Sequence, residues 1–363
     1  MSWRCGLIGL PNAGKTTIFN ALTAGQAEVA PYPFCTINPN IGVVPVPDPR
    51  LDRLGELLKP QRLTPVAIEF VDVAGLIQGA SRGEGLGNQF LASLREVDLL
   101  VHVVRVFGDE RCPHPLASLD PVRDVEVVET ELLLADLEIL SRQRLKLEKR
   151  AQAGDKAAAQ AHPTLIRVEA GLNRGTWARD LDLSPGELEH LEGTPLLTLK
   201  PCLFVANLSE AEFAGGPHYA ALQDLAAARH RPVVPILGDL EMELQAFAPE
   251  ERQEFLASLG LAESGMARLV RESSRLLGLV TFYTIVGPEV RAWHVPVGTP
   301  APRAAGQVHS DMEKGFIRAE VMPFTALDEL GAPSRVKEAG LLRVEGRDYL
   351  VADGDILLFR FHP

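Results

Sequence analysis

Residues 9–16 read Gly9-Leu10-Pro11-Asn12-Ala13-Gly14-Lys15-Thr16, between a short apolar run and a helical pattern. In this spacing, G-x-x-x-x-G-K-[ST], the glycines let the backbone wrap until successive N–H groups point at phosphate oxygens, and the following helix adds its positive N-terminal end. Lys15 is expected to reach the β and γ phosphates as the catalytic cation, and the Thr16 hydroxyl to ligate Mg²⁺. The stretch predicts a P-loop whose nucleotide contacts come from Asn12, Ala13, Gly14, Lys15, Thr16 and Thr17.

Asn12 has two interpretations. It is a common turn residue, or its side chain helps to hold a monovalent cation such as K⁺ beside the phosphates, in place of an arginine. Equal hydrolysis rates in potassium and sodium would exclude the second interpretation.

The composition bounds the class of protein. A chain of 363 residues exceeds one comfortable hydrophobic core, so two or three domains are expected. The net charge of -12 argues against a protein that coats a nucleic-acid backbone. No run approaches the ~18 apolar residues of a membrane span, and residues 1–4 lead into a core strand rather than a signal peptide, so we expect a cytoplasmic protein without a membrane partner. The scattered Cys5, Cys35, Cys112 and Cys202 suggest reduced thiols.

The chain alternates β-branched runs with helical patterns, which is typical of an α/β fold with a parallel sheet. Strands are predicted at residues 4–8, 41–46, 66–72, 98–106, 202–207 and 232–237. The wide gap before residue 202 predicts an insertion. There, residues 120–150 form a long helical pattern with a basic end at 142–150, residues 151–162 break it, 163–172 return, and Ser184-Pro185-Gly186-Glu187 begins a capped helix. We interpret the insertion as a coiled-coil arm.

The C-terminal part has a different texture, with short strand patterns at 279–286, 290–297 and 356–361 between glycines and prolines. It predicts a small α+β domain. The expected domains are therefore a nucleotide-binding domain in two parts, a helical insertion and a terminal domain, at residues 1–122 with 199–278, 123–198 and 279–363.

Two further motifs suit a nucleotide switch. Asp72-Val73-Ala74-Gly75 follows a strand, so Asp72 can hold Mg²⁺ through water and the Gly75 N–H can meet the γ-phosphate. Thr36 lies before the second strand, where a switch threonine would ligate Mg²⁺; a plain loop threonine is the alternative. Leu76 stands where Ras-like proteins have a glutamine that orients the attacking water, so either water positioning comes from elsewhere or intrinsic hydrolysis is slow.

The base-reading stretch after the fifth predicted strand is Asn207-Leu208-Ser209-Glu210. A GTPase normally has Asn-Lys-x-Asp there, and its aspartate takes two hydrogen bonds from guanine. Glu210 is one methylene longer, and Leu208 replaces the lysine that packs over the base. We therefore expect ATP in preference to GTP, with conventional guanine preference as the alternative.

These motifs resemble the YchF family of Obg-like ATPases over essentially the whole chain. The resemblance rests on the P-loop, Tyr32-Pro33-Phe34-Cys35-Thr36, residues 72–76, Gly87-Asn88-Gln89-Phe90, residues 207–210 and the C-terminal Glu313-Lys314-Gly315-Phe316-Ile317-Arg318-Ala319. It implies a Ras-like domain with a helical insertion and a ubiquitin-like β-grasp (TGS) domain. It also implies ATP hydrolysis and ribosome association. The basic run 142–150 of the arm is a candidate contact for ribosomal RNA, with a solvated helical face as the alternative, and the TGS domain is a second candidate.

The resemblance further implies that a histidine in the loop after the fourth strand assists hydrolysis, and His114 is the matching position. Its neighbours Pro113 and Pro115 differ from the more polar loop expected there, so a surface histidine is the alternative. His102 competes for the role, but its apolar surroundings favour a core histidine.

Overall fold

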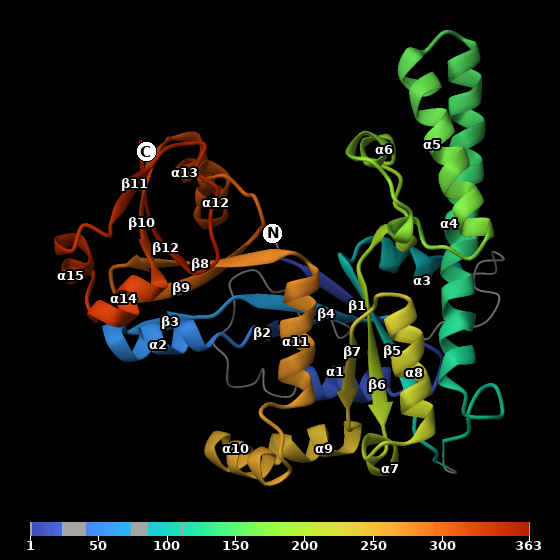
Figure 1. Ribbon diagram of the computed structural model, residues 1–363, viewed down its shortest axis with the longest axis horizontal. Coiled ribbons are helices and arrows are strands. Elements are labelled where there is room, and N and C mark those ends of the chain that lie inside the picture. The colour runs from blue at the N-terminus through green and yellow to red at the C-terminus, as the bar shows by residue number, and fades with distance from the viewer. Residues whose placement is uncertain (1, 24–40, 74–85, 110–111, 363) are drawn as a thin grey trace. The chain divides into compact units, whose positions relative to one another are not determined.

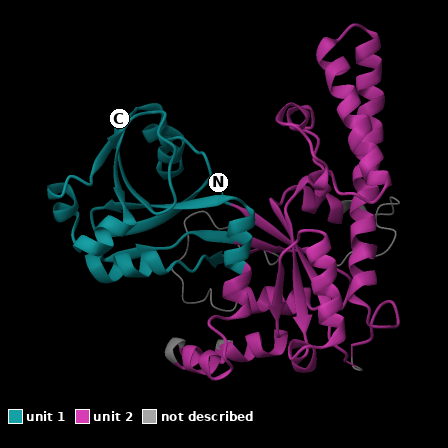
Figure 2. Cartoon of the chain, in the orientation of Figure 1, with its two compact units in different colours: residues 1–2, 44–68, 270–363 teal, residues 3–43, 69–269 magenta. Residues whose placement is uncertain are grey.

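The computed structural model describes residues 2–23, 41–73, 86–109 and 112–362 of the chain. The chain forms two compact units, coloured separately in Figure 2. The P-loop unit spans residues 3–43 and 69–269, and the C-terminal unit spans residues 1–2, 44–68 and 270–363. Two six-stranded sheets form their frameworks (Figure 1).

The first sheet has the strand order β2-β4-β1-β5-β6-β7. Its strands are β1 (Arg4–Ile8), β2 (Ile41–Pro45), β4 (Ala67–Asp72), β5 (Leu99–Val106), β6 (Cys202–Leu208) and β7 (Val233–Ile236). The neighbouring pairs β4–β1, β1–β5, β5–β6 and β6–β7 are all parallel. Every residue of β5 and β6 is buried, as expected for central strands covered on both faces. The predicted parallel sheet with an insertion after β5 is confirmed.

The P-loop unit also contains helices, the last of which continues into the C-terminal unit. They are α1 (Lys15–Thr23), α3 (Leu86–Arg95), α7 (Glu210–Phe213), α8 (Pro217–Ala228), α9 (Gly238–Glu243), the 3-10 turn η5 (Leu244–Ala246), α10 (Pro249–Ser258) and α11 (Gly265–Leu276). None of the helices in the described part of the chain has the length and apolar content that a bilayer crossing needs.

The insertion forms a helical arm. It contains α4 (Pro121–Gln152), α5 (Lys156–Asn173), the 3-10 turns η3 (Ala178–Asp180) and η4 (Leu197–Leu199), and α6 (Pro185–His190). Figure 1 shows α4 and α5 side by side. The inner half of α4 buries Val125, Val128 and Leu132 in the core of the first sheet, and the outer half packs Leu140 against α5.

The structure confirms the predicted capping box of the arm and corrects the predicted break between its two long helices. The capping box at Ser184 and Glu187 is present at the start of α6. The predicted break at 151–162 is too long, because α5 already begins at Lys156, where the Asp155 carboxylate accepts a hydrogen bond from the Ala158 N–H. Pro163 lies inside this helix. Packing of α5 on α4 therefore overrides the local penalty for proline.

The C-terminal unit contains the second sheet, in the order β11-β10-β12-β8-β9-β3. Its strands are β3 (Arg62–Thr64), β8 (Leu279–Val286), β9 (Glu289–Pro296), β10 (Phe316–Pro323), β11 (Arg343–Glu345) and β12 (Asp355–Phe361); its helices are α2 (Pro49–Leu58), α12 (Ala301–Val308), α13 (Ser310–Lys314), α14 (Phe324–Leu330) and α15 (Pro333–Glu338). The first and last strands of the terminal segment, β8 and β12, pair in parallel at its centre. The predicted β-grasp fold is confirmed.

The segment between β2 and β4 was not foreseen as part of this second sheet. Its strand β3 pairs in parallel with β9. Its helix α2 buries Leu51 and Leu54 in the same core as Tyr283. Arg50 binds Asp353, with 2.6 Å between Nη1 and Oδ2. No motif in residues 44–68 predicts this long-range pairing.

Candidate nucleotide-binding site

The loop after β1 has a backbone that requires glycine at two positions. Gly9 has φ of +144° and Gly14 has φ of +90°. A Cβ atom at Gly9 would lie 2.3 Å from the Val103 carbonyl oxygen, and one at Gly14 would lie 2.1 Å from Asn207 Nδ2. The loop therefore wraps closely against β5 and β6 before α1 begins at Lys15.

Lys15 is buried under this loop. Its Nζ donates hydrogen bonds to the carbonyl oxygens of Gly9 and Leu10, at 3.1 and 2.8 Å. Burial lowers the pKa of Lys15 to about 8, although the negative charge of Asp72 opposes the shift. The loop thus holds an amine whose charge a phosphate group would stabilise.

Thr16 and Asp72 meet at the mouth of the loop. Because β4 pairs with β1, Asp72 lies opposite Leu7, and its Oδ2 accepts a hydrogen bond from Thr16 Oγ1 at 3.0 Å. A hydroxyl and a carboxylate side by side are oxygen ligands of the kind that Mg²⁺ prefers, so these residues fit the predicted ion. Thr17 is half-buried in the first turn of α1. Thr36, Gly75 and Leu76 lie outside the described residues.

The predicted base-reading residues lie where β6 ends. Asn207 is buried, and its Nδ2 donates to the Ala13 carbonyl oxygen at 3.1 Å, which joins this stretch to the P-loop. Leu208 is buried as well. Glu210 is exposed as the first residue of α7, which Ser209 caps by accepting a hydrogen bond from the Glu212 N–H. The stretch therefore begins with two buried residues, Asn207 and Leu208, and ends with the exposed carboxylate of Glu210.

The segment that follows β5 is held against the P-loop. Asn12, at a left-handed φ of 62°, donates from Nδ2 to the Pro113 carbonyl oxygen at 3.1 Å. Arg105, buried at the end of β5, donates to the carbonyl oxygens of Phe107 and Cys112 at 3.0 and 2.8 Å, and to that of Asn12 at 3.5 Å. This guanidinium is thus a link between the P-loop and the segment that carries His114.

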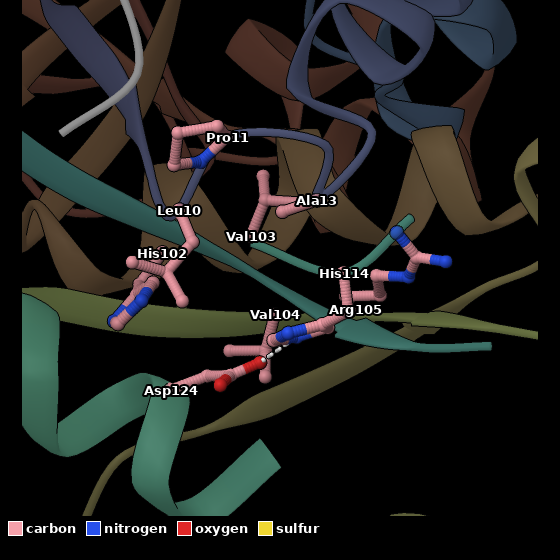
Figure 3. Close-up of a pocket in the computed structure, with 9 residues that line it drawn as sticks. All are labelled: Leu10, Pro11, Ala13, His102, Val103, Val104, Arg105, His114 and Asp124. Carbon is pink, nitrogen blue, oxygen red and sulfur yellow. Dashed lines mark hydrogen bonds and ion pairs between the residues drawn. The ribbon is translucent and has the colours of Figure 1, made fainter. Parts of the chain in front are cut away.

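His114 points to helix α4. Its Nε2 lies 2.7 Å from Asp124 Oδ2, and its Nδ1 accepts a hydrogen bond from the Leu116 N–H at 3.1 Å. Both side chains border a hollow that Leu10, Pro11 and Ala13 line from the P-loop, shown in Figure 3. The exposed surface histidine that was the alternative is therefore wrong for this conformation, because only 7% of the His114 side chain is exposed.

His102 is a core residue. It is 2% exposed and its ring meets that of Phe204 edge-on at 5.5 Å. Burial lowers the pKa of His102 to about 3, and the nearby charge of Lys15 acts in the same direction. The residue is neutral at physiological pH, as the interpretation of a core histidine expects.

Sequence reasoning missed Arg105 and Asp124, which hold the His114 segment from opposite sides. Arg105 did leave a signal, because a charged residue inside an apolar strand pattern must find buried partners. Asp124 left none, since it reads as an ordinary acidic residue in the first turn of a helix.

Comparison with known proteins identifies the family. A family model described as 50S ribosome-binding GTPase matches residues 4–138, and the model YchF-GTPase_C, described as a protein of unknown function, matches residues 279–362. The chain is 45% identical over 362 residues to "Ribosome-binding ATPase YchF" of Pasteurella multocida, with 100% of both chains covered. The chain belongs to the YchF family.

Other YchF proteins agree in length and fold. The Bacillus subtilis "Ribosome-binding ATPase YchF" is 43% identical over 365 residues, again with 100% of both chains covered. A solved structure, titled "Structure of the Schizosaccharomyces pombe YchF GTPase", has a TM-score of 0.90 at 32% identity and covers 99% of this chain and 98% of that one. The resemblance seen in the motifs is confirmed, and with it the P-loop nucleoside triphosphatase fold.

Proposed function

We propose that this YchF protein is a Mg²⁺-dependent ATPase that hydrolyses ATP in preference to GTP and acts as a ribosome-associated switch in the cytoplasm. The observation that carries the choice of base is the stretch after β6. The side-chain amide of Asn207 donates its hydrogen bond to the Ala13 carbonyl oxygen. Leu208 stands in place of the lysine that packs over the base. Glu210 is an exposed glutamate in place of the aspartate that binds guanine. Backbone groups near Leu208 offer adenine a donor and an acceptor.

The hydrolytic site is proposed around the P-loop. Thr16, Thr36 and Asp72 would hold Mg²⁺, which when bound supplies positive charge to the β and γ phosphates. Lys15 and the amides from Asn12 to Thr17, with the Gly75 N–H, would stabilise the charge that develops on the transferred group. The side-chain nitrogen of Asn12, Nδ2, is bonded to Pro113, so the side-chain oxygen Oδ1 is the atom proposed to bind K⁺.

Ribosome association is proposed from the names of the relatives, several of which are "Ribosome-binding ATPase YchF". Two surfaces were expected to touch ribosomal RNA. On the arm, Arg142, Arg144 and Arg150 of the basic run are each paired with a carboxylate of the arm itself. In the terminal domain, Arg318, Arg343 and Arg360 are paired with carboxylates as well, so the arm and the TGS domain both stay candidates for the contact.

A GTPase with guanine preference is the second candidate, because the family model and the S. pombe structure carry that name. Binding constants for ATP and GTP at matched Mg²⁺ decide between the two. We expect tighter binding of ATP, and a guanine preference of tenfold or more would overturn the assignment. The Lys15→Ala variant serves as the control for a damaged phosphate site.

The ribosome role has a separate test. Turnover is expected to rise sharply on addition of ribosomes, and removal of residues 279–363 is expected to abolish co-sedimentation. Turnover that ribosomes leave unchanged would contradict the switch. The same assay in potassium and in sodium tests the proposed cation at Asn12, since equal rates would remove that idea.

A further inference from the structure

The hydrogen bonds of His114 define which ring nitrogen carries its proton. The Leu116 N–H can only donate, so Nδ1, which lies 3.1 Å from it, must accept and is unprotonated. The proton of the imidazole is then on Nε2, and it is donated to Asp124 Oδ2 at 2.7 Å. With both nitrogens occupied, this imidazole can neither take a proton from water nor donate one to a phosphate.

The carboxylate that binds His114 is itself held in place. Asp124 Oδ1 accepts a hydrogen bond from Arg123 Nη2 at 3.0 Å. That guanidinium is in turn anchored on the Ser118 hydroxyl and carbonyl oxygens, at 2.9 and 2.6 Å. Only 5% of the Asp124 side chain is exposed, so its two oxygens have defined partners in a buried place.

The opposite side of the same segment is tied to the P-loop. Pro113, the residue before His114, accepts a hydrogen bond from Asn12, and Arg105 links Cys112 to the Asn12 carbonyl. A nucleotide that settles on the P-loop thus meets a segment whose histidine is turned towards α4. Figure 3 shows the His114 ring directed at Asp124 rather than at Ala13.

We propose that Asp124 is a positioning residue that latches His114 against helix α4, and that hydrolysis requires His114 to leave Asp124. The latch rests on the proposed ATPase function and on the role in hydrolysis that the family resemblance implies for His114. In the resting state His114 is bound to Asp124, and this contact at the start of helix α4 keeps turnover low.

Kinetics of the Asp124→Ala variant test the latch. We expect kcat to rise at least about tenfold, the equivalent of one charge-assisted hydrogen bond, with KM within about twofold. The gain should vanish in the double variant with His114→Ala. Glu126→Ala, an exposed carboxylate on the same helix, is the matched control and should leave kcat unchanged. A folded Asp124→Ala variant whose kcat stays equal or falls would overturn the latch.

Spectroscopy of the unmodified protein gives a readout that no folding defect can disturb. Long-range ¹H–¹⁵N spectra should show His114 as the Nε2–H tautomer in the free protein, assigned by its loss in His114→Ala. A non-hydrolysable nucleotide analogue should change that pattern. An unchanged pattern in the nucleotide complex would mean that the latch stays shut and would refute it. Running adenine and guanine analogues separates the two proposals, because guanine preference would overturn the ATPase assignment and leave the latch intact.

Discussion

The two halves of helix α4 use the same residue types in opposite ways. The inner half buries Asp124, Glu129 and Asp136, each with a partner on another part of the P-loop unit. The outer half pairs charges in water: Glu138 with Arg142, and Asp155, just beyond the helix, with Arg150. Charge counts separate an acidic inner half from a basic end, but they do not show which carboxylates are buried.

The difference lies in what the partners of each carboxylate lose when the carboxylate is removed. Asp136 is completely buried, and its oxygens accept from the Leu197 N–H, the Thr198 N–H and the Thr198 hydroxyl at 2.7 to 2.9 Å. A buried donor without a partner costs far more than an exposed one, which water satisfies. Asp136 therefore determines how η4 leads the chain back into β6, whereas the exposed carboxylates of the outer half add little.

The first prediction concerns the removal of a buried carboxylate from the inner half of α4. Asp136→Ala leaves three buried donors unsatisfied where η4 leads into β6, so we expect the free energy of unfolding to fall by about 3 kcal/mol or more. Urea unfolding monitored by circular dichroism measures the change.

The matched control is Glu192→Ala, an exposed carboxylate in the same arm. It should leave the unfolding midpoint in place. Equal losses in the two variants would mean that the burial of Asp136 has no energetic consequence and that the inner and outer carboxylates do not differ.

The same distinction explains what the sequence could predict. Short-range patterns predict the P-loop, the strands around it and the capped start of α6. Each depends on residues close together in the sequence, such as Gly9 with Gly14, or Ser184 with Glu187. The start of α5 was misplaced because Pro163 argues locally against a helix that packing on α4 maintains. The pairing of β3 with β9 joins segments more than two hundred residues apart, and no local pattern records it.

The candidate site divides in the same manner. Lys15, Thr16 and Asp72 could be placed because a phosphate loop fixes their spacing, and the structure brings Thr16 and Asp72 together. Position 114 could be named but its partner could not, because Asp124 contacts it only through the fold. The roles of these residues in catalysis stay predictions.

The second prediction concerns a buried imidazole, the side chain of His102. His102 has a folded pKa of about 3, against about 6.5 in the unfolded chain. Below pH 6.5 the unfolded chain binds a proton that the folded protein refuses, so this group contributes a loss of stability of about 1.4 kcal/mol for each pH unit down to about pH 3. His102→Leu should remove that contribution.

Unfolding free energies measured from pH 7.5 to pH 5 test this slope. His230→Asn is the control, because His230 is exposed and asparagine tolerates its left-handed backbone at φ of 52°. If the control flattens the profile as much as His102→Leu does, burial of His102 is not the source of the slope.

The third prediction concerns the outer half and expects the smallest effect. Arg150 is 63% exposed and binds Asp155 Oδ2 from Nε and Nη2 at 3.0 and 2.6 Å. An exposed pair of this kind contributes almost nothing, so Arg150→Ala should shift the melting temperature by less than about 2 °C. Asp155→Ala should cost more than its partner's removal, because that carboxylate also caps α5 through the Ala158 N–H. The asymmetry separates the ion pair from the cap by differential scanning calorimetry. Equal shifts would show that the pair, rather than the cap, holds the tip of the arm, and the outer half would then resemble the inner one.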